Sequence, residues 1–198
     1  MRATQILERE HRSILSIVEG CRVFAEDLKR GEKVPANALQ NVVEFFRIYG
    51  SQRHHREEQW LLSTLQGKGL HEGDCLLTMF KEEHRKIACM VEELAGYVSN
   101  YAQSGGDQAT KVADTLHSLA ELYSSHIWKE DNILLPFADK LFSDSEQQRL
   151  SEIFQMVTSG REQEAIYANE QASGSIKEWT RAMHRDKRST WLPILYGL

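Results

Sequence analysis

The sequence predicts an all-α protein, specifically an antiparallel up-and-down four-helix bundle with additional C-terminal helices. Apolar residues recur at steps of three and four residues, the helical period, in four long segments. Short glycine-rich stretches separate these segments, and the 198 residues include only three prolines. Because short connections leave successive helices as neighbours, the four helices should pack antiparallel to one another.

The first helix is expected from about residue 4 to residue 30, where Gly31 fits a C-terminal cap. Pro35 suits the first turn of the second helix, because a proline needs no amide donor there. That second helix should end near the Gly67-Lys68-Gly69 stretch.

The third helix should begin near Asp74 and end at the Ser104-Gly105-Gly106 break. The fourth follows, and Pro136 should end or kink it. A capping-box pattern at 143–146 (Ser-Asp-Ser-Glu) opens a shorter fifth helix that would cover one end of the bundle. A sixth, more polar helix is expected from about 161 to 185.

We therefore expect residues 1–160 to form the bundle with its capping helix, and residues 161–198 to form a helical extension. The apolar stretch 191–196 either packs back onto the bundle or makes a contact in a homodimer.

Composition narrows the functional classes. Hydrophobic residues at 41% and charged residues at 27% are typical of a soluble globular protein. The net charge of −5 and the lack of a long basic face argue against nucleic acid as a partner. No apolar run reaches membrane-spanning or signal-peptide length, and three cysteines without a Cys-x-x-Cys spacing indicate neither a disulfide framework nor a thiolate zinc site. A cytoplasmic location is expected.

Each of the four long helices carries one histidine within its apolar stripe, and two helices add a glutamate one turn later. The histidines are His11, His54, His84 and His126, and the glutamates are Glu58 and Glu130. A spacing of i, i+4 puts each histidine and its glutamate on the same helix face. One such histidine is usually an ordinary core residue, but four in register indicate a shared site.

A metal centre explains this set, because burying two carboxylates and four imidazoles without compensation is costly. Nitrogen and oxygen donors without thiolate fit iron or manganese better than structural zinc, and six ligands suit two metals. If both glutamates bridge, each metal receives four protein bonds. A bridging oxide or hydroxide raises this to five and leaves one open position on each metal.

Four segments resemble the hemerythrin family, in particular its bacterial HHE branch, over about residues 1–170. They are EREH at 8–11, HHREEQWLL at 54–62, EEHRK at 82–86 and HIWKEDNILLP at 126–136. The resemblance implies a four-helix bundle that holds a non-haem di-iron centre, with two iron ions under an oxo or hydroxo bridge. It also implies that His11, His54, Glu58, His84, His126 and Glu130 are the ligands, with manganese or zinc as substitutes for iron.

One position departs from the family pattern. Oxygen-carrying hemerythrins have a second histidine four residues after the third-helix ligand, where this sequence has Ala88. The missing ligand either leaves a further open position or is replaced by water or by a carboxylate such as Glu57. Asp131 competes with Glu130 as the fourth-helix carboxylate, and we favour Glu130 because i+4 stays on the His126 face.

Three more residues are candidates for the surroundings of the centre, each with an ordinary packing role as the alternative. Gly50 leaves space for a ligand channel or for close helix packing, Tyr123 brings a hydroxyl near the metals, and Trp60 forms an apolar wall. His55 points about 100° away from His54 on an α-helix, so we expect it at the surface or behind the ligands.

The resemblance implies that the protein binds or reacts with a small oxidant or diatomic ligand, namely oxygen, peroxide or nitric oxide. The sequence defines no particular reaction. Two alternatives are an iron- or oxygen-responsive sensor and a protein that repairs iron centres in nitrosative stress.

Overall fold

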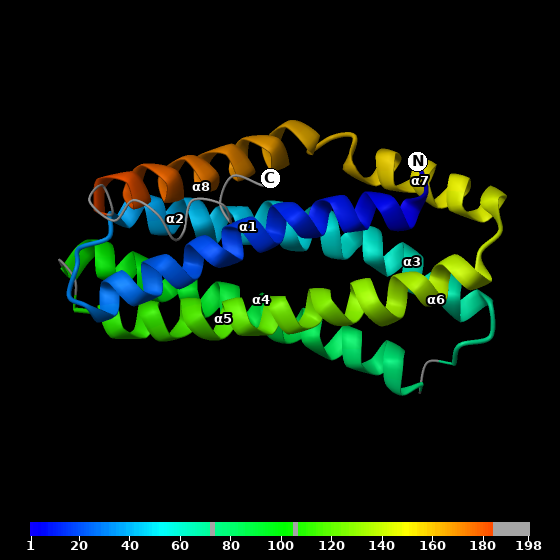
Figure 1. Cartoon of the computed structure of the whole chain (residues 1–198), viewed down its shortest axis with the longest axis horizontal. Coiled ribbons are helices and arrows are strands. Elements are labelled where there is room, and N and C mark those ends of the chain that lie inside the picture. Colours follow the sequence, from blue (N-terminus) through cyan, green and yellow to red (C-terminus); the bar gives the residue numbers. More distant parts are fainter. Residues whose placement is uncertain (72–73, 105–106, 184–198) are drawn as a thin grey trace.

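The computed structural model describes residues 1–71, 74–104 and 107–183, and it contains only helices and connecting turns within these ranges (Figure 1). The predicted all-α fold is confirmed. The elements in chain order are α1 (Ala3–Lys29), α2 (Ala36–Phe45), η1 (Phe46–His54), α3 (His55–Gly67), α4 (Cys75–Ser104), α5 (Ala109–Lys129), η2 (Glu130–Leu134), α6 (Leu135–Leu141), α7 (Asp144–Thr158) and α8 (Glu162–Met183). The two elements named η are π-helical.

The long helical segments lie side by side along the longest axis of the molecule (Figure 1). α1 packs against α5, α5 against α4, and α4 against α2. α2 and α3 form one continuous segment through η1, as α5 and α6 do through η2. α7 covers α1 and α3, and α8 packs on α1 and α2, so the two C-terminal helices lie along one side of the bundle.

The helix ends follow the local sequence signals. Gly31 has a φ of +86°, the left-handed conformation that glycine adopts after a helix. At α7, the Ser143 hydroxyl accepts a hydrogen bond from the Glu146 backbone amide, while the Glu146 carboxylate accepts one from the Ser143 amide. The predicted capping box is therefore confirmed.

Pro136 does not end the fourth long segment, which continues to Leu141. Instead, η2 widens the helix just before the proline, and the Leu135 amide donates to the Glu130 carbonyl five residues back. A proline lacks an amide and clashes with the carbonyl four residues before it, so the π-helical turn accommodates Pro136 without breaking the segment.

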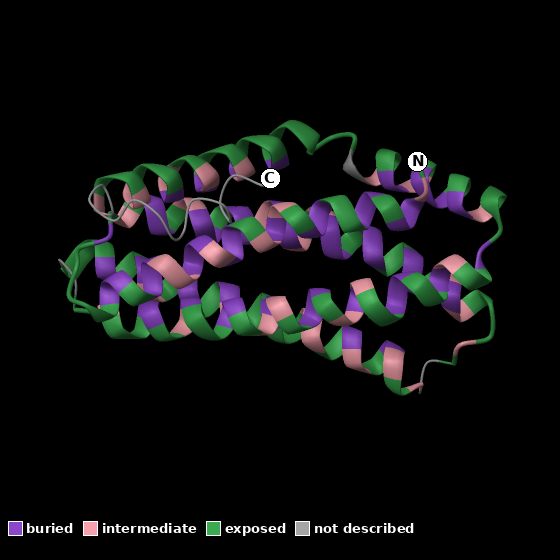
Figure 2. Cartoon of the chain, in the orientation of Figure 1, coloured by how far each residue is buried: buried purple, intermediate pink, exposed green. Residues whose placement is uncertain are grey.

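Buried residues lie mainly on the sides that the helices turn toward one another (Figure 2). The buried apolar residues form two clusters. The larger cluster extends from Ile14 and Phe24 to Leu116 and Tyr123, at the end where α1 meets α2. The smaller one surrounds Phe80 and includes the start of α1 together with α3, α6 and α7. Polar residues lie between the clusters on every long segment, and those on every long segment except α4 are buried.

No described helix is both long and apolar enough to cross a membrane. The apolar stretch 191–196, for which we expect a packing or dimer contact, lies outside the described residues.

Candidate metal centre

A band of polar residues, here called the polar layer, separates the two apolar clusters. On α1 and α4 the chain passes from one cluster to the other at a histidine, between Leu7 and Ile14 and between Phe80 and Ile87. On the segment that joins α5 to α6 the passage lies at Glu130, four residues after His126. The polar layer comprises Glu10, His11, His54, His55, Glu57, Glu58, His84, His126 and Glu130. All are buried except His84, which is slightly exposed.

The polar layer holds side-chain atoms that protein hydrogen bonds do not satisfy. In the described part of the chain, every buried side-chain nitrogen or oxygen without a hydrogen-bond partner belongs either to the polar layer or to Tyr123 beside it. These atoms include Nε2 of three histidines and all four carboxylate oxygens of Glu58 and Glu130. Unpaired buried polar atoms are rare and costly, so their concentration here indicates a site built for another group.

Three histidines and one carboxylate form the first cluster of candidate ligands, the three-histidine group. His55, His84, His126 and Glu58 each bring a donor atom within 4.8 Å of the others. The Nε2 atoms of His84 and His126 lie 3.1 Å apart. The four side chains come from α3, α4 and α5 and converge on one point.

The second cluster, the two-histidine group, consists of His11, His54, Glu58 and Glu130 under the same distance limit. Glu58 belongs to both groups: one of its oxygens lies 3.4 Å from His54 Nε2 and the other 3.1 Å from His84 Nε2. Glu130 spans the groups in the same way, with its oxygens 3.2 Å from His11 Nε2 and 3.0 Å from His126 Nε2. Each carboxylate thus turns one oxygen toward each group, as a carboxylate that bridges two cations would.

Three of the histidines form a hydrogen bond to a carboxylate through Nδ1, the ring nitrogen that does not face the site. Nδ1 of His11 donates to Asp131 at 2.6 Å. Nδ1 of His54 donates to Glu10 at 3.1 Å, and Nδ1 of His126 donates to Glu83 at 2.9 Å. With Nδ1 hydrogen-bonded in this way, each ring turns its Nε2 toward the site. Metal-binding histidines typically have this carboxylate–histidine arrangement.

The profile of the hemerythrin HHE cation-binding domain matches residues 2–138, which contain both candidate groups. The chain belongs to the hemerythrin family. Comparisons with curated proteins and with solved structures give no significant match. The unpaired nitrogen and oxygen atoms of the polar layer fit the cation that this hemerythrin domain is expected to hold.

Sequence reasoning missed His55, which is buried and not at the surface. The expected 100° turn between His54 and His55 assumes an α-helix, but η1 ends at His54, and the His55 amide donates to the Gly50 carbonyl five residues back. The wider turn brings both neighbouring histidines inward. Two adjacent histidines are visible in the sequence, but only the π-helical geometry of η1 explains why both side chains are buried.

Ala88, the position of the missing family histidine, is exposed on α4 in this hemerythrin domain. A histidine at this position would face away from the polar layer. The third histidine beside His84 and His126 is supplied instead by His55, from the other side of the group. Neither candidate group includes Glu57, the carboxylate that we considered as the replacement.

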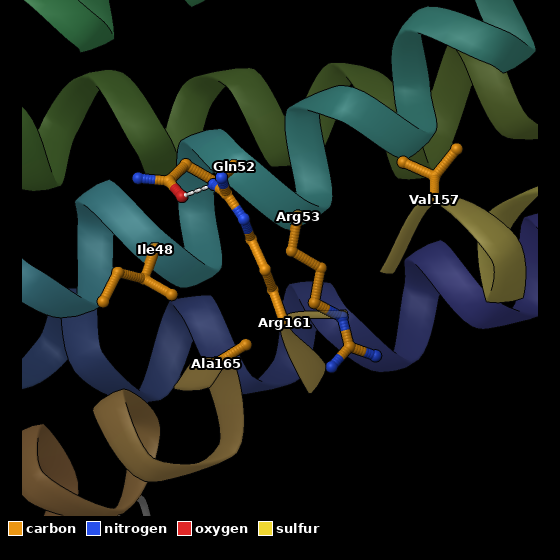
Figure 3. Close-up of a pocket in the computed structure, with 6 residues that line it drawn as sticks. All are labelled: Ile48, Gln52, Arg53, Val157, Arg161 and Ala165. Carbon is orange, nitrogen blue, oxygen red and sulfur yellow. Dashed lines mark hydrogen bonds between the residues drawn. The ribbon is translucent and has the colours of Figure 1, made fainter. Parts of the chain in front are cut away.

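Glu57 lies beside Glu10, and Arg53 contacts both of these carboxylates. Burial and the nearby charge of Glu10 raise the pKa of Glu57 to about 9. Arg53 also lines a small surface pocket together with Ile48, Gln52, Val157, Arg161 and Ala165 (Figure 3). Through Arg53 and Glu10, the pocket is connected to His54 by hydrogen bonds.

Trp60 does not line the centre, because its side chain is 45% exposed. It follows Glu58 by two residues, which turns it about 200° around the helix and away from the polar layer.

Asp131 and Glu130 were the two candidates for the carboxylate ligand that follows His126. Asp131 hydrogen-bonds to Nδ1 of His11, on the side of the ring away from the site, whereas Glu130 faces both groups. This arrangement favours Glu130 as the ligand.

The ring nitrogens of the polar layer differ in their affinity for protons. Burial alone would lower the pKa of His11 and His126, but neighbouring carboxylates outweigh it and raise both values to about 10. The pKa of His84 rises to about 9, chiefly through Glu58, against the same effect of burial. His55 is the exception: burial and the other histidines lower its pKa, so its ring is neutral and keeps a lone pair that could bind a cation.

Proposed function

We propose that this hemerythrin domain holds two iron ions and binds or reacts with a small oxidant or diatomic ligand, namely oxygen, peroxide or nitric oxide. The observation that carries the proposal is the pair of carboxylates, Glu58 and Glu130, that each face both histidine groups. An all nitrogen and oxygen donor set of this size suits two iron ions. Bound there, iron supplies Lewis-acid and redox chemistry for a small ligand.

The proposed ligands are His55, His84 and His126 for one ion, His11 and His54 for the other, and Glu58 and Glu130 for both. The first ion then receives five protein donor atoms and the second receives four.

The chain's own residues keep this site dry and oriented. Apolar clusters close it on both sides along the bundle axis, and carboxylates behind three histidines fix the direction of their Nε2 lone pairs.

The first test is metal analysis of protein purified without added metal, together with its visible absorption in air and after peroxide. We expect about two irons per chain and the absorption band of an oxo-bridged di-iron centre. Protein that carries no metal, or a single zinc ion, would contradict the proposal.

Substitutions then test the ligand set. His84→Ala, Glu130→Ala and His55→Ala should each lower the iron content markedly, because each removes a donor atom from a candidate group. His117→Ala is the matched control, since His117 is exposed on α5 and distant from both groups. Equal iron content in all four variants would rule out this ligand set, and a loss in every variant except His55→Ala would rule out His55.

A further inference from the structure

Tyr123 places a phenol hydroxyl, completely buried, at the edge of the polar layer. It is one of the largest fully buried side chains of the protein, and its hydroxyl has no hydrogen-bond partner among the described residues. Its ring stacks on Phe46 at 4.9 Å, so packing alone would be equally served by phenylalanine. A buried hydroxyl without a partner lowers stability, so packing does not account for it.

Gly50 provides the space into which this hydroxyl fits. A Cβ atom at residue 50 would lie 2.7 Å from the Tyr123 hydroxyl oxygen, so a larger residue there would force the hydroxyl to move. Gly50 is not needed for its backbone conformation, because the positive φ angles in the described chain belong to Gly31 and Gly69. A glycine within a helical segment weakens the helix, and here it allows the hydroxyl to approach η1.

The Tyr123 side chain lies beside the three-histidine group. The Tyr123 ring lies 6.1 Å from the His55 ring and nearly parallel to it. A phenol keeps its proton at neutral pH, so the Tyr123 hydroxyl can donate a hydrogen bond. Neither Glu58 nor Glu130 accepts this proton, since their carboxylate oxygens are themselves without hydrogen-bond partners.

We propose that Tyr123 is the hydrogen-bond donor for the small ligand bound in the centre, and that Gly50 is required for its hydroxyl to reach that ligand. This inference rests on the proposed two-metal function. It assigns a ligand class: molecules that present a hydrogen-bond-accepting atom, such as peroxide, nitric oxide or an anion, are favoured over carbon monoxide, which accepts hydrogen bonds poorly.

Azide is a suitable probe, because it is a small anion with acceptor atoms at both ends. We would titrate azide into the iron-loaded full chain and follow the visible absorption of the wild type, Tyr123→Phe and Gly50→Ala. Tyr101→Phe is the matched control, since Tyr101 is also a buried tyrosine, but its hydroxyl donates to the Val34 carbonyl at the other end of the larger apolar cluster.

We expect Tyr123→Phe to retain two irons and to bind azide about ten-fold more weakly, as expected for the loss of one hydrogen bond to an anion. Gly50→Ala should weaken azide binding as well, because the new methyl group displaces the hydroxyl. Tyr101→Phe should bind azide like the wild type. The vibrational frequency of bound azide should shift in Tyr123→Phe, which a purely structural role for the hydroxyl would not cause.

Unchanged azide affinity in both Tyr123→Phe and Gly50→Ala would overturn the inference and leave the proposed function intact. Loss of iron from Tyr123→Phe, with iron retained in Tyr101→Phe, would also overturn it, because the hydroxyl would then support the metals and not the ligand. A wild-type chain that binds no iron would instead contradict the proposed function. If Tyr123→Phe does not fold, Gly50→Ala tests the same contact.

Discussion

The Nε2 atoms of His84 and His126, which come from neighbouring antiparallel helices, lie 3.1 Å apart. Each also faces a carboxylate oxygen, Glu58 at 3.1 Å for His84 and Glu130 at 3.0 Å for His126. Two ligand atoms about 2.1 Å from one cation and at right angles to each other are about 3 Å apart. The spacing of these two imidazoles is therefore that of ligands on a single ion.

Without metal, the carboxylates beside these histidines should make the stability of the protein depend on pH. The pKa values of His11 and His126 are raised to about 10 and that of His84 to about 9. Because the folded chain holds these protons more tightly than the unfolded chain, whose histidines titrate near 6.5, their stabilisation is complete below about pH 6.5. It decreases as pH rises toward 9 and 10. The melting temperature of the metal-free protein should therefore fall between pH 6.5 and 9.

Iron-loaded protein should show the opposite trend, since the ligands must lose their protons to bind metal and acid competes with the cation. Thermal unfolding followed by the helical circular dichroism signal, at several pH values with and without iron, measures both trends. A melting temperature of the metal-free chain that stays constant from pH 6.5 to 9 would show that these histidines are not protonated in the folded state.

The carboxylate behind His11 should affect metal affinity without touching the metal. Asp131 accepts the Nδ1 proton of His11 at 2.6 Å, which fixes the ring so that Nε2 faces Glu130. Asp131→Ala should lower iron affinity by about 10- to 100-fold, the usual effect of removing such a partner. Competition with a chelator of known affinity measures the change. Asp144→Ala removes an exposed carboxylate that pairs with Arg2, and its iron affinity should equal that of the wild type.

Much of this architecture follows from helical periodicity. The four long segments, the capping box at Ser143 and the convergence of one histidine per segment are all visible in the spacing of the residues. These features depend on local backbone preferences and on which side of a helix a residue occupies.

Helical periodicity does not predict the π-helical turns η1 and η2. A pattern read at 3.6 residues per turn cannot place His55 beside His54, and it does not decide whether Pro136 ends the helix or only distorts it. Both features depend on a local departure from α-helical geometry, and both departures lie at proposed ligands, since η1 ends at His54 and η2 begins at Glu130. The carboxylates behind the histidines were also missed, because their pairing depends on contacts between helices distant in sequence.

The packing of α8 on α1 gives a prediction about stability. A Cβ atom at Gly20 would lie 2.3 to 2.8 Å from three carbon atoms of Ile176, which is buried between the two helices. The β-branched isoleucine side chain has few alternative rotamers, so it cannot easily move aside. Gly20→Ala should therefore destabilise the protein by about 1 to 3 kcal/mol, as overpacking in a core does.

Gly174→Ala is the matched control on α8, because a Cβ atom there meets nothing within 4 Å. Alanine is the better helix former, so this variant should gain up to about 1 kcal/mol in the free energy of unfolding. Denaturant titration measures both changes, and Ile176→Ala in the Gly20→Ala background should recover part of the loss because it removes the clashing atoms. If α8 did not pack on α1 in solution, Gly20→Ala would stabilise the chain just as Gly174→Ala does, and the effects of Gly20→Ala and Ile176→Ala would be additive.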